Sequence, residues 1–458
     1  MKKKKTIQII SFLAILSLIL SACGGGGSSD SGTSSGNSGA NGGNGGNGAK
    51  SEQIELTFSH YYLEEERPTS AEMDSYMTLV EEWEAKNPNV NLVQSVMSQA
   101  DYSTKIQAQA AVNEVPDIFF LKGSWVSNFV NNDLVMPINE YLDKYEYKDK
   151  FRKGVFDAAT RDGKIYGIPN QLSITSVVFY NEQLWKEIGY DRFPDNWDDI
   201  YKAAEKFNEK GITTIALGNK DKWPAESTIL STLGDRFTGT DWTNSIIARD
   251  GQAKFTDPEF VSALDQMHNI AANKVFNADF NVISNTQADE YYAQGKAAAT
   301  IEGHWTVSYL LSSASEEVLS QTNVAILPPV DGGKGDNNTI SGGAGWYVAL
   351  NKNLEGAKLE AAMDFLFSTA GYDFSRVYAE KYGMTGPSVI EGIDLTQFPQ
   401  LTQDFAALTG SLTFTPIYDM LMEGSVIEIM NTGLQEVLNG TKTGQELAEQ
   451  LQTGQDNL

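Results

Sequence analysis

The chain of 458 residues contains a single cysteine, Cys23, and this limits how its folded part can be held together. Cys23 follows a short apolar run near the N-terminus, so residues 51–458 contain no cysteine at all. No disulfide can staple that part of the chain, and its stability has to come from a hydrophobic core. About 400 residues suffice to bury such cores in two domains of roughly 200 residues each.

The N-terminus has the pattern of an export signal. Residues 2–5 are lysines, residues 7–20 are mostly apolar, and the small residues Ser21 and Ala22 precede Cys23. The apolar run is too short to cross a bilayer comfortably. Its Leu-Ser-Ala-Cys ending resembles a bacterial lipobox, which implies that residues 1–22 are a lipoprotein signal peptide and that Cys23 carries lipid, palmitate included. The alternative is an ordinary secretory signal with an incidental cysteine.

Residues 24–50 are almost entirely Gly, Ser and Asn. Such a segment cannot bury enough apolar surface to offset its ordering entropy, so residues 23–50 are predicted to be a lipidated, disordered tether. The tether and the lipobox together favour an extracellular location on the cell membrane, at the surface of a Gram-positive cell.

The charge of the chain excludes one class of partner. The formal net charge is −26, and removal of the four lysines of the signal would take it to about −30. Nucleic-acid binding requires Lys and Arg to neutralise phosphates, so we expect no nucleic-acid partner. An acidic surface is also repelled by anionic lipid, so we expect membrane contact through the N-terminal lipid only.

The rest of the chain alternates strand-like and helix-like patterns. Residues 54–58, 90–96 and 116–121 read as strands, and residues 72–86 and 102–111 between them have helical spacing. This rhythm predicts βαβ units and α/β sheets covered by helices. Ligands of such sheets bind beyond the carboxyl ends of the strands.

Several short motifs in order resemble those of family 1 extracellular solute-binding proteins, the carbohydrate-binding lipoproteins of ABC importers. They are PDIFF at 116–120, DGKIYGIP at 162–169, FYNEQLW at 179–185, NWDDI at 196–200, GKAAA at 295–299 with GHW at 303–305, LPP at 327–329 and GGAGW at 342–346. The resemblance extends over roughly residues 54–440.

The resemblance implies a two-lobed periplasmic-binding-protein-like fold of type II, with a mostly parallel sheet flanked by helices in each lobe. The first lobe would hold residues 51–171 and 323–371, and the second would hold residues 172–322 and 372–458. A carbohydrate, from monosaccharide to oligosaccharide, would bind in the cleft between the lobes and pass to the permease subunits of the importer. We expect no cofactor, no metal and no obligate oligomer, so the chain would act as a monomer.

Sugar binding requires aromatic faces for the apolar sides of the rings and polar groups for the hydroxyls. Aromatic residues at expected strand ends and loops are the first candidates, and packing in the core is the alternative for each. These candidates are Tyr61, Trp125, Trp223, Trp305 and Trp346.

The polar candidates lie in the same segments. They are Lys122, Ser124, Gln171 and Glu302. Gln171 falls where the chain crosses between lobes, so a hinge hydrogen bond is its alternative role. The family often has an acidic residue or Asn soon after the PDI strand, where this chain has Lys122. That difference indicates an altered ligand, including an acidic sugar paired by Lys122.

No sequence motif indicates an enzyme. The three histidines lie far apart without close metal partners, no phosphate-binding loop occurs, and a G-x-S-x-G match at residues 32–36 lies in the predicted tether. A lipid-anchored glycoside hydrolase remains an alternative, because two facing carboxylates leave no sequence signature. A sugar sensor or adhesin that feeds no permease is the other.

Overall fold

The computed structural model describes residues 53–458, so the predicted signal peptide, Cys23 and the tether lie outside the described residues. The first sheet has the strand order β2-β1-β3-β12-β6. Its strands are β1 (Ile54–His60), β2 (Val90–Val96), β3 (Ile118–Lys122), β6 (Ile168–Pro169) and β12 (Trp346–Leu350). β1 is parallel to β2 and β3, whereas β12 is antiparallel to β3 and β6. The central strand β3 is a continuous apolar run because both of its faces are covered.

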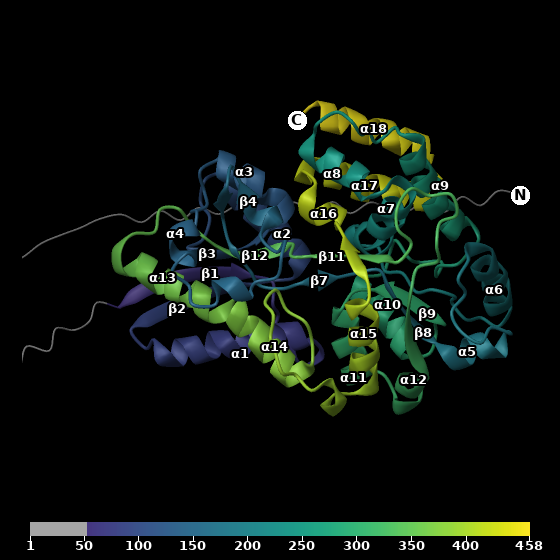
Figure 1. The fold of residues 1–458 in the computed structure, drawn as a ribbon, viewed down its shortest axis with the longest axis horizontal. Helices are drawn as coiled ribbons and strands as arrows, with labels where there is room; N and C mark the ends of the chain where they lie inside the picture. The colour runs from purple at the N-terminus through teal and green to yellow at the C-terminus, as the bar shows by residue number, and fades with distance from the viewer. Residues whose placement is uncertain (1–52) are drawn as a thin grey trace, which may run out of the picture. The chain divides into compact units, whose positions relative to one another are not determined.

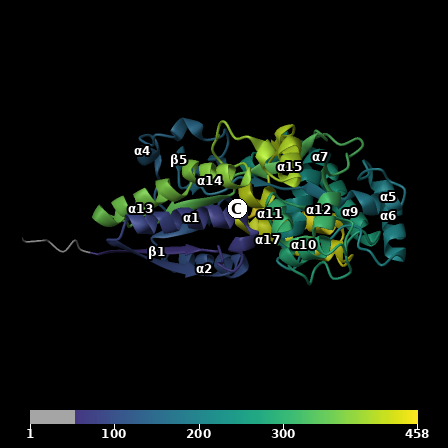
Figure 2. The same cartoon turned by 90° about the horizontal axis from the view of Figure 1, so that it is seen from below.

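Helices cover both faces of this sheet and, with a small hairpin, complete the first lobe (Figure 1). They are α1 (Ala71–Lys86), α2 (Gln99–Ala111), α3 (Val126–Asn131), α4 (Asn139–Leu142), α13 (Gly356–Thr369) and α14 (Tyr372–Tyr382), with the hairpin β4 (Thr160–Arg161) and β5 (Lys164–Ile165). Figures 1 and 2 both show α1, α13 and α14 side by side. The Ser70 side chain caps α1 by accepting from the Met73 amide.

A small sheet of β7 (Ser173–Ile174), β11 (Thr339–Gly343) and β13 (Thr413–Thr415) lies where the chain passes from the first lobe to the second. The second lobe is built on the sheet β10-β8-β9. Its strands are β8 (Val177–Asn181), β9 (Ala299–Glu302) and β10 (Thr322–Ile326). Because β6 leads directly into β7 and β11 into β12, residues 170–172 and 344–345 are two of the connections between lobes.

Most of the second lobe is helical. Its helices are α5 (Glu182–Glu187), α6 (Trp197–Glu209), α7 (Ser231–Thr238), α8 (Thr240–Ala248), α9 (Pro258–Ala272), α10 (Asn285–Ala293), α11 (Trp305–Ser313), α12 (Glu316–Gln321), α15 (Gln400–Gly410), α16 (Tyr418–Leu421), α17 (Gly424–Leu438) and α18 (Gly444–Asp456). One π-helical turn, Ala225–Leu230, precedes α7. In the part of the chain from residue 53 onward, no helix combines the length and hydropathy that a bilayer crossing requires.

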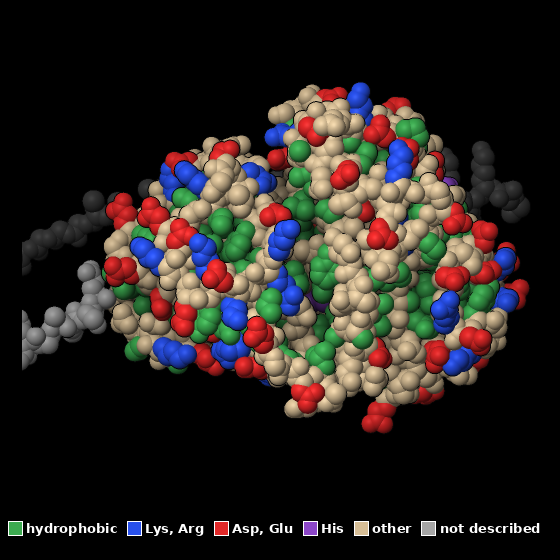
Figure 3. Space-filling view, viewed as in Figure 1, with side chains coloured by type: hydrophobic (Ala, Val, Ile, Leu, Met, Phe, Trp, Pro, Cys, Tyr) green, Lys and Arg blue, Asp and Glu red, His purple; other side chains and the backbone are tan. Residues whose placement is uncertain are grey.

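Two large hydrophobic clusters form the cores, one around each main sheet. Trp83 in the first and Trp185 in the second are buried, and their indole nitrogens donate to Asp364 Oδ2 (2.7 Å) and the Ala298 carbonyl (3.1 Å). Because both polar tips are bonded, these large rings stabilise the cores without leaving a buried donor unpaired. On the face shown in Figure 3, acidic side chains are spread over both lobes.

The predicted α/β fold with two lobes is confirmed, but three details differ from the expectation. The three named strands of the sheet β10-β8-β9 pair antiparallel rather than mostly parallel, and only isolated bridges from residues 213–216 run parallel to the β9 segment. β10 pairs with β8, although the expected boundaries assigned residues 323–371 to the first lobe. α14 packs on α1 and α13, although residues 372–458 were expected in the second lobe. The boundaries otherwise stay a prediction.

Candidate ligand-binding site

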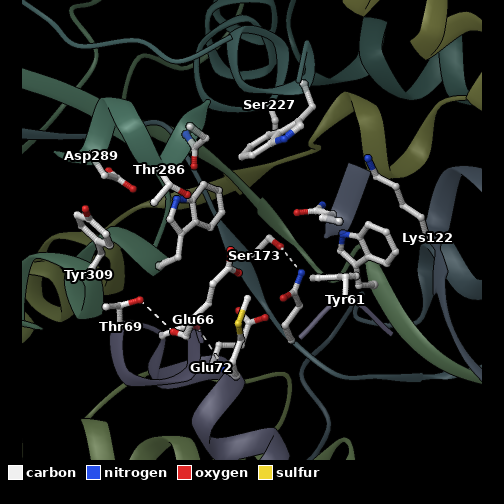
Figure 4. A pocket seen from close by; sticks show the side chains of 18 of the residues that line it. Tyr61, Glu66, Thr69, Glu72, Lys122, Ser173, Ser227, Thr286, Asp289 and Tyr309 are labelled. Atoms are coloured by element: carbon white, nitrogen blue, oxygen red, sulfur yellow. Dashed lines mark hydrogen bonds between the residues drawn. The ribbon is translucent and has the colours of Figure 1, made fainter. Parts of the chain in front are cut away.

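A cavity lies between the two lobes, with about 1020 Å³ of empty space including its open mouth. Side chains reach it from the ends of β1, β3 and the crossing segment, and from the first turns of α1, α2, α10 and α11. Figure 4 shows Asp289 and Tyr309 on one side of the cavity and Tyr61 and Lys122 on the other.

Two tryptophans form the aromatic surface on the second-lobe side. Trp305 is the first residue of α11, and its ring lies 5.7 Å from that of Trp223, at 75°. A Cβ added to Gly303 would lie 2.3 Å from the Trp305 indole, so the ring rests directly on the glycine backbone. Lys222 has φ of 69°, a left-handed conformation that few residues with a side chain adopt, immediately before Trp223. The local backbone therefore determines where both rings lie.

The aromatic residues on the first-lobe side are packed against one another. Trp346, the first residue of β12, is 3% exposed and lies between Tyr61 (4.9 Å, 63°) and Trp125 (5.3 Å, 85°). Lys122 Nζ lies 5.8 Å from the Trp346 ring centroid. Because its neighbours cover most of the ring, Trp346 lines the cavity with only a small exposed area.

Below the cavity, one carboxylate collects hydrogen bonds from both lobes. Glu72 accepts from the Tyr62 hydroxyl (2.5 Å) and from His304 Nε2 (2.9 Å). With its amide nitrogen turned toward Glu72, Gln171 also donates to that carboxylate, 2.9 Å from Oε2. The carboxylate oxygens of Glu72 therefore already accept hydrogen bonds from protein donors. Gln171 lines the cavity and also bonds Glu72 from the segment that connects the lobes.

At the first-lobe end, a lysine and an aspartate form an ion pair across the lobes. Lys122 Nζ, at the end of β3, lies 2.5 Å from Oδ2 of Asp419 in α16. The second oxygen of Asp419 has no partner, and neither does Oε2 of the buried Glu226. Burial, followed by the charge of Asp419, raises the pKa of Glu226 well above its usual range, which favours its protonated form.

A second pair of acids lies beside Trp305. Glu302 is fully buried and accepts from Asn285 Nδ2 (2.6 Å) and from Trp305 Nε1 (3.3 Å). Asp289, 3% exposed, lines the cavity and accepts from Thr306 at 3.1 Å. Burial raises the pKa of Asp289 to about 7, and burial followed by the charge of Asp289 raises that of Glu302 well above its usual range.

Six of the nine candidate site residues from the sequence line this cavity. They are Tyr61, Lys122, Gln171, Trp223, Trp305 and Trp346. The other three lie behind the lining: Ser124 is 4% exposed, Trp125 packs between Trp346 and the Gly424 region, and Glu302 is capped by the Trp305 indole nitrogen. Trp305 was expected to end a strand, and it begins a helix instead.

Sequence reasoning missed most of the polar lining. The missed residues include Glu66, Glu72, Gln99, Asn285, Thr286, Asp289, Tyr309 and Asp419. Several of them lie in the first turn of a helix, and the Ser284 capping box would have located the start of α10 beside Asn285. Nothing in the local sequence distinguishes Asp419 from other acids, because its partner Lys122 is 297 residues away.

The chain resembles a known family of binding proteins in sequence and solved sugar-related binding proteins in fold. The profile of the family described as bacterial extracellular solute-binding protein matches residues 67–373. A chitin oligosaccharide binding protein has a TM-score of 0.78 and 23% identity, covering 89% of this chain and 99% of its own. A structure from a study of xylan utilization by the thermophilic bacterium Caldanaerobius polysaccharolyticus has a TM-score of 0.77 and 25% identity, covering 87% of this chain and 99% of its own.

Curated relatives match over shorter stretches. An uncharacterized ABC transporter extracellular-binding protein of Pyrococcus horikoshii is 23% identical over 266 residues, which is 57% of this chain and 58% of that protein. The chain thus spans little more than half the length of this curated relative.

Proposed function

Because this chain belongs to the bacterial extracellular solute-binding protein family, we propose that it captures a carbohydrate in the cavity between its lobes and delivers it to an ABC importer permease. The observation that carries the proposal is that the paired rings of Trp223 and Trp305 line the cavity beside polar groups. Aromatic rings contact the apolar faces of sugars, and carboxylates, amides and hydroxyls pair with the sugar hydroxyls. The 25% identical structure from work on xylan utilization supports a carbohydrate rather than another solute.

The lobes would close on the ligand by movement about the connections at residues 170–172 and 344–345. A ligand shifts such an equilibrium only when it binds one state better, so the permease would recognise the form that the sugar stabilises. Binding without chemistry is expected, as in the family, with the chain acting as a monomer.

Calorimetry with the full chain and a panel of neutral mono- and oligosaccharides tests this function. We expect saturable binding of at least one sugar at one site, with the sugar recovered intact by chromatography afterwards. Shortened products would instead support a glycoside hydrolase, and the absence of binding by any carbohydrate would overturn the proposal.

We also propose that Cys23 carries the lipid that holds the chain on the outer face of the cell membrane of a Gram-positive cell. Its support is the pattern of residues 1–23. Cys23→Ser should move the protein from the membrane fraction to the medium and abolish incorporation of labelled palmitate. Retention of label in that variant would contradict the assignment.

A further inference from the structure

The cavity contains more acid than base. Its lining has four carboxylates and one lysine, and no arginine is present among these residues. The lysine is Lys122, and the acids are Glu66, Glu72, Asp289 and Asp419. A ligand therefore meets a net negative wall, and any anionic group on it would need the single lysine for compensation.

Lys122 is not free to give that compensation. Asp419 Oδ2 lies 2.5 Å from its Nζ, and the side chains of Lys122 and Asp419 are 13% and 4% exposed. The same ammonium group lies 5.8 Å from the centroid of the Trp346 ring. A ligand carboxylate at Lys122 would share the ammonium with Asp419, so its charge would meet a lysine that a buried carboxylate already offsets.

Asp419 is also built into its position. It lies in the short helix α16, and the carbonyl oxygen of the next residue, Met420, packs against Gly123. A Cβ added to Gly123 would lie 2.4 Å from that oxygen, so α16 lies close to the end of β3. The other carboxylate oxygen of Asp419, Oδ1, has no hydrogen-bond partner, while the single charge of the carboxylate offsets that of the Lys122 ammonium. Burying a carboxylate with only one of its oxygens in a hydrogen bond costs free energy. That cost favours a role for Asp419 in binding or selectivity.

We propose that Asp419 is a specificity-determining residue that occupies Lys122 and thereby makes the site reject acidic sugars in favour of uncharged ones. This inference rests on the proposed carbohydrate-binding function and names the charge class of its ligand. It also replaces the sequence interpretation in which Lys122 pairs with an acidic sugar. Of the remaining lining acids, Glu66 adds negative charge that repels a uronate, and both Glu66 and Asp289 can form hydrogen bonds with sugar hydroxyls.

The test compares a neutral oligosaccharide that binds the full chain with the same oligosaccharide after oxidation of a primary hydroxyl to a carboxylate. The wild-type chain should bind the oxidised form at least tenfold more weakly, and the difference should shrink when salt is raised, because salt screens the repulsion. Oxidised ligand binding within threefold of the neutral one would overturn the inference while leaving the proposed function intact.

A variant tests the role of Asp419 itself. Asp419→Asn combined with Glu226→Gln removes both acids near Lys122, so its ammonium becomes available, and affinity for the oxidised ligand should rise at least tenfold. Glu226→Gln alone is the matched control, because it keeps the ion pair and should still reject the oxidised ligand. A folded double variant that binds the neutral ligand without any gain for the oxidised one would sink the inference. If the double variant does not fold, the comparison of neutral and oxidised ligands with the wild-type chain decides whether the site rejects acidic sugars.

Discussion

His304 Nε2 donates to Glu72 Oε2 across 2.9 Å, and this bond joins the two lobes beneath the cavity. His304 follows β9 in the second lobe, whereas Glu72 lies in the first turn of α1 in the first lobe. The other ring nitrogen of His304 accepts from the Ile174 amide at 3.4 Å, so a neutral imidazole satisfies both contacts. The Lys122–Asp419 pair is a second polar contact between the lobes.

Loss of the Glu72 carboxylate should destabilise the chain. In Glu72→Ala, the hydroxyl of Tyr62 and the His304 ring lose a buried acceptor, and each unpaired buried donor costs about 1–3 kcal/mol. We expect the free energy of unfolding to fall by at least about 2 kcal/mol in urea denaturation. Glu82→Ala on the same helix is the control, because the Glu82 side chain is 52% exposed. Equal midpoints for the two variants would contradict this role.

The sequence predicted the parts of this site that depend on nearby residues. Lys122 ends an apolar strand at 118–122, and strand ends of an open sheet point to its ligand edge, so its place in the cavity followed from the local pattern. Trp305 and Trp346 were found through motifs that resemble those of the family, and both line the cavity.

Contacts between distant segments could not be predicted in this way. Trp346 reads as a candidate cleft aromatic at the start of a strand, and Tyr61 and Trp125 from other elements cover most of its ring. Glu302 is the last residue of β9. The indole nitrogen of Trp305 donates to its carboxyl group, so Glu302 lies behind Trp305 and does not line the cavity. The first outcome depends on packing between elements far apart in the sequence, whereas the second depends on the local turn at residues 302–305, whose conformation the residue pattern does not specify.

The absence of a side chain at Gly303 should matter for binding. In Gly303→Ala the new Cβ would lie 2.3 Å from the Trp305 ring, so the indole has to move from its place beside the cavity. We expect the affinity for the carbohydrate to fall at least fivefold in calorimetry. Gly410→Ala is the control, because a Cβ there meets no atom within 4 Å, and its affinity should match the wild-type value. Equal affinities for both variants would argue against the Trp305 placement.

Trp305 and Trp346 should differ in what their loss affects. Trp305 is half-buried with an edge toward the cavity, so Trp305→Ala should lower ligand affinity at least tenfold, about 1.4 kcal/mol, and leave the chain folded. Trp346 is 3% exposed in the first core, so Trp346→Ala should lower the free energy of unfolding by about 3–5 kcal/mol. Calorimetry and urea denaturation of both variants check this, and the reverse pattern would show that the two roles are exchanged.

The pH dependence of stability should change when Asp289 is replaced. Burial raises the pKa of Asp289 from 3.8 to about 7, so between these values the folded state binds more protons than the unfolded state. Its contribution to stability is therefore greatest at low pH and is lost as pH rises toward 7, by up to about 4 kcal/mol at 1.36 kcal/mol per pKa unit. Asp289→Asn stays neutral, and its side-chain oxygen can still accept from Thr306. The stability of this variant relative to the wild type should thus increase between pH 4.5 and pH 8 in urea denaturation. Asp331→Asn, at an exposed loop position, should show no such change, and a pH-independent difference for Asp289→Asn would contradict the raised pKa.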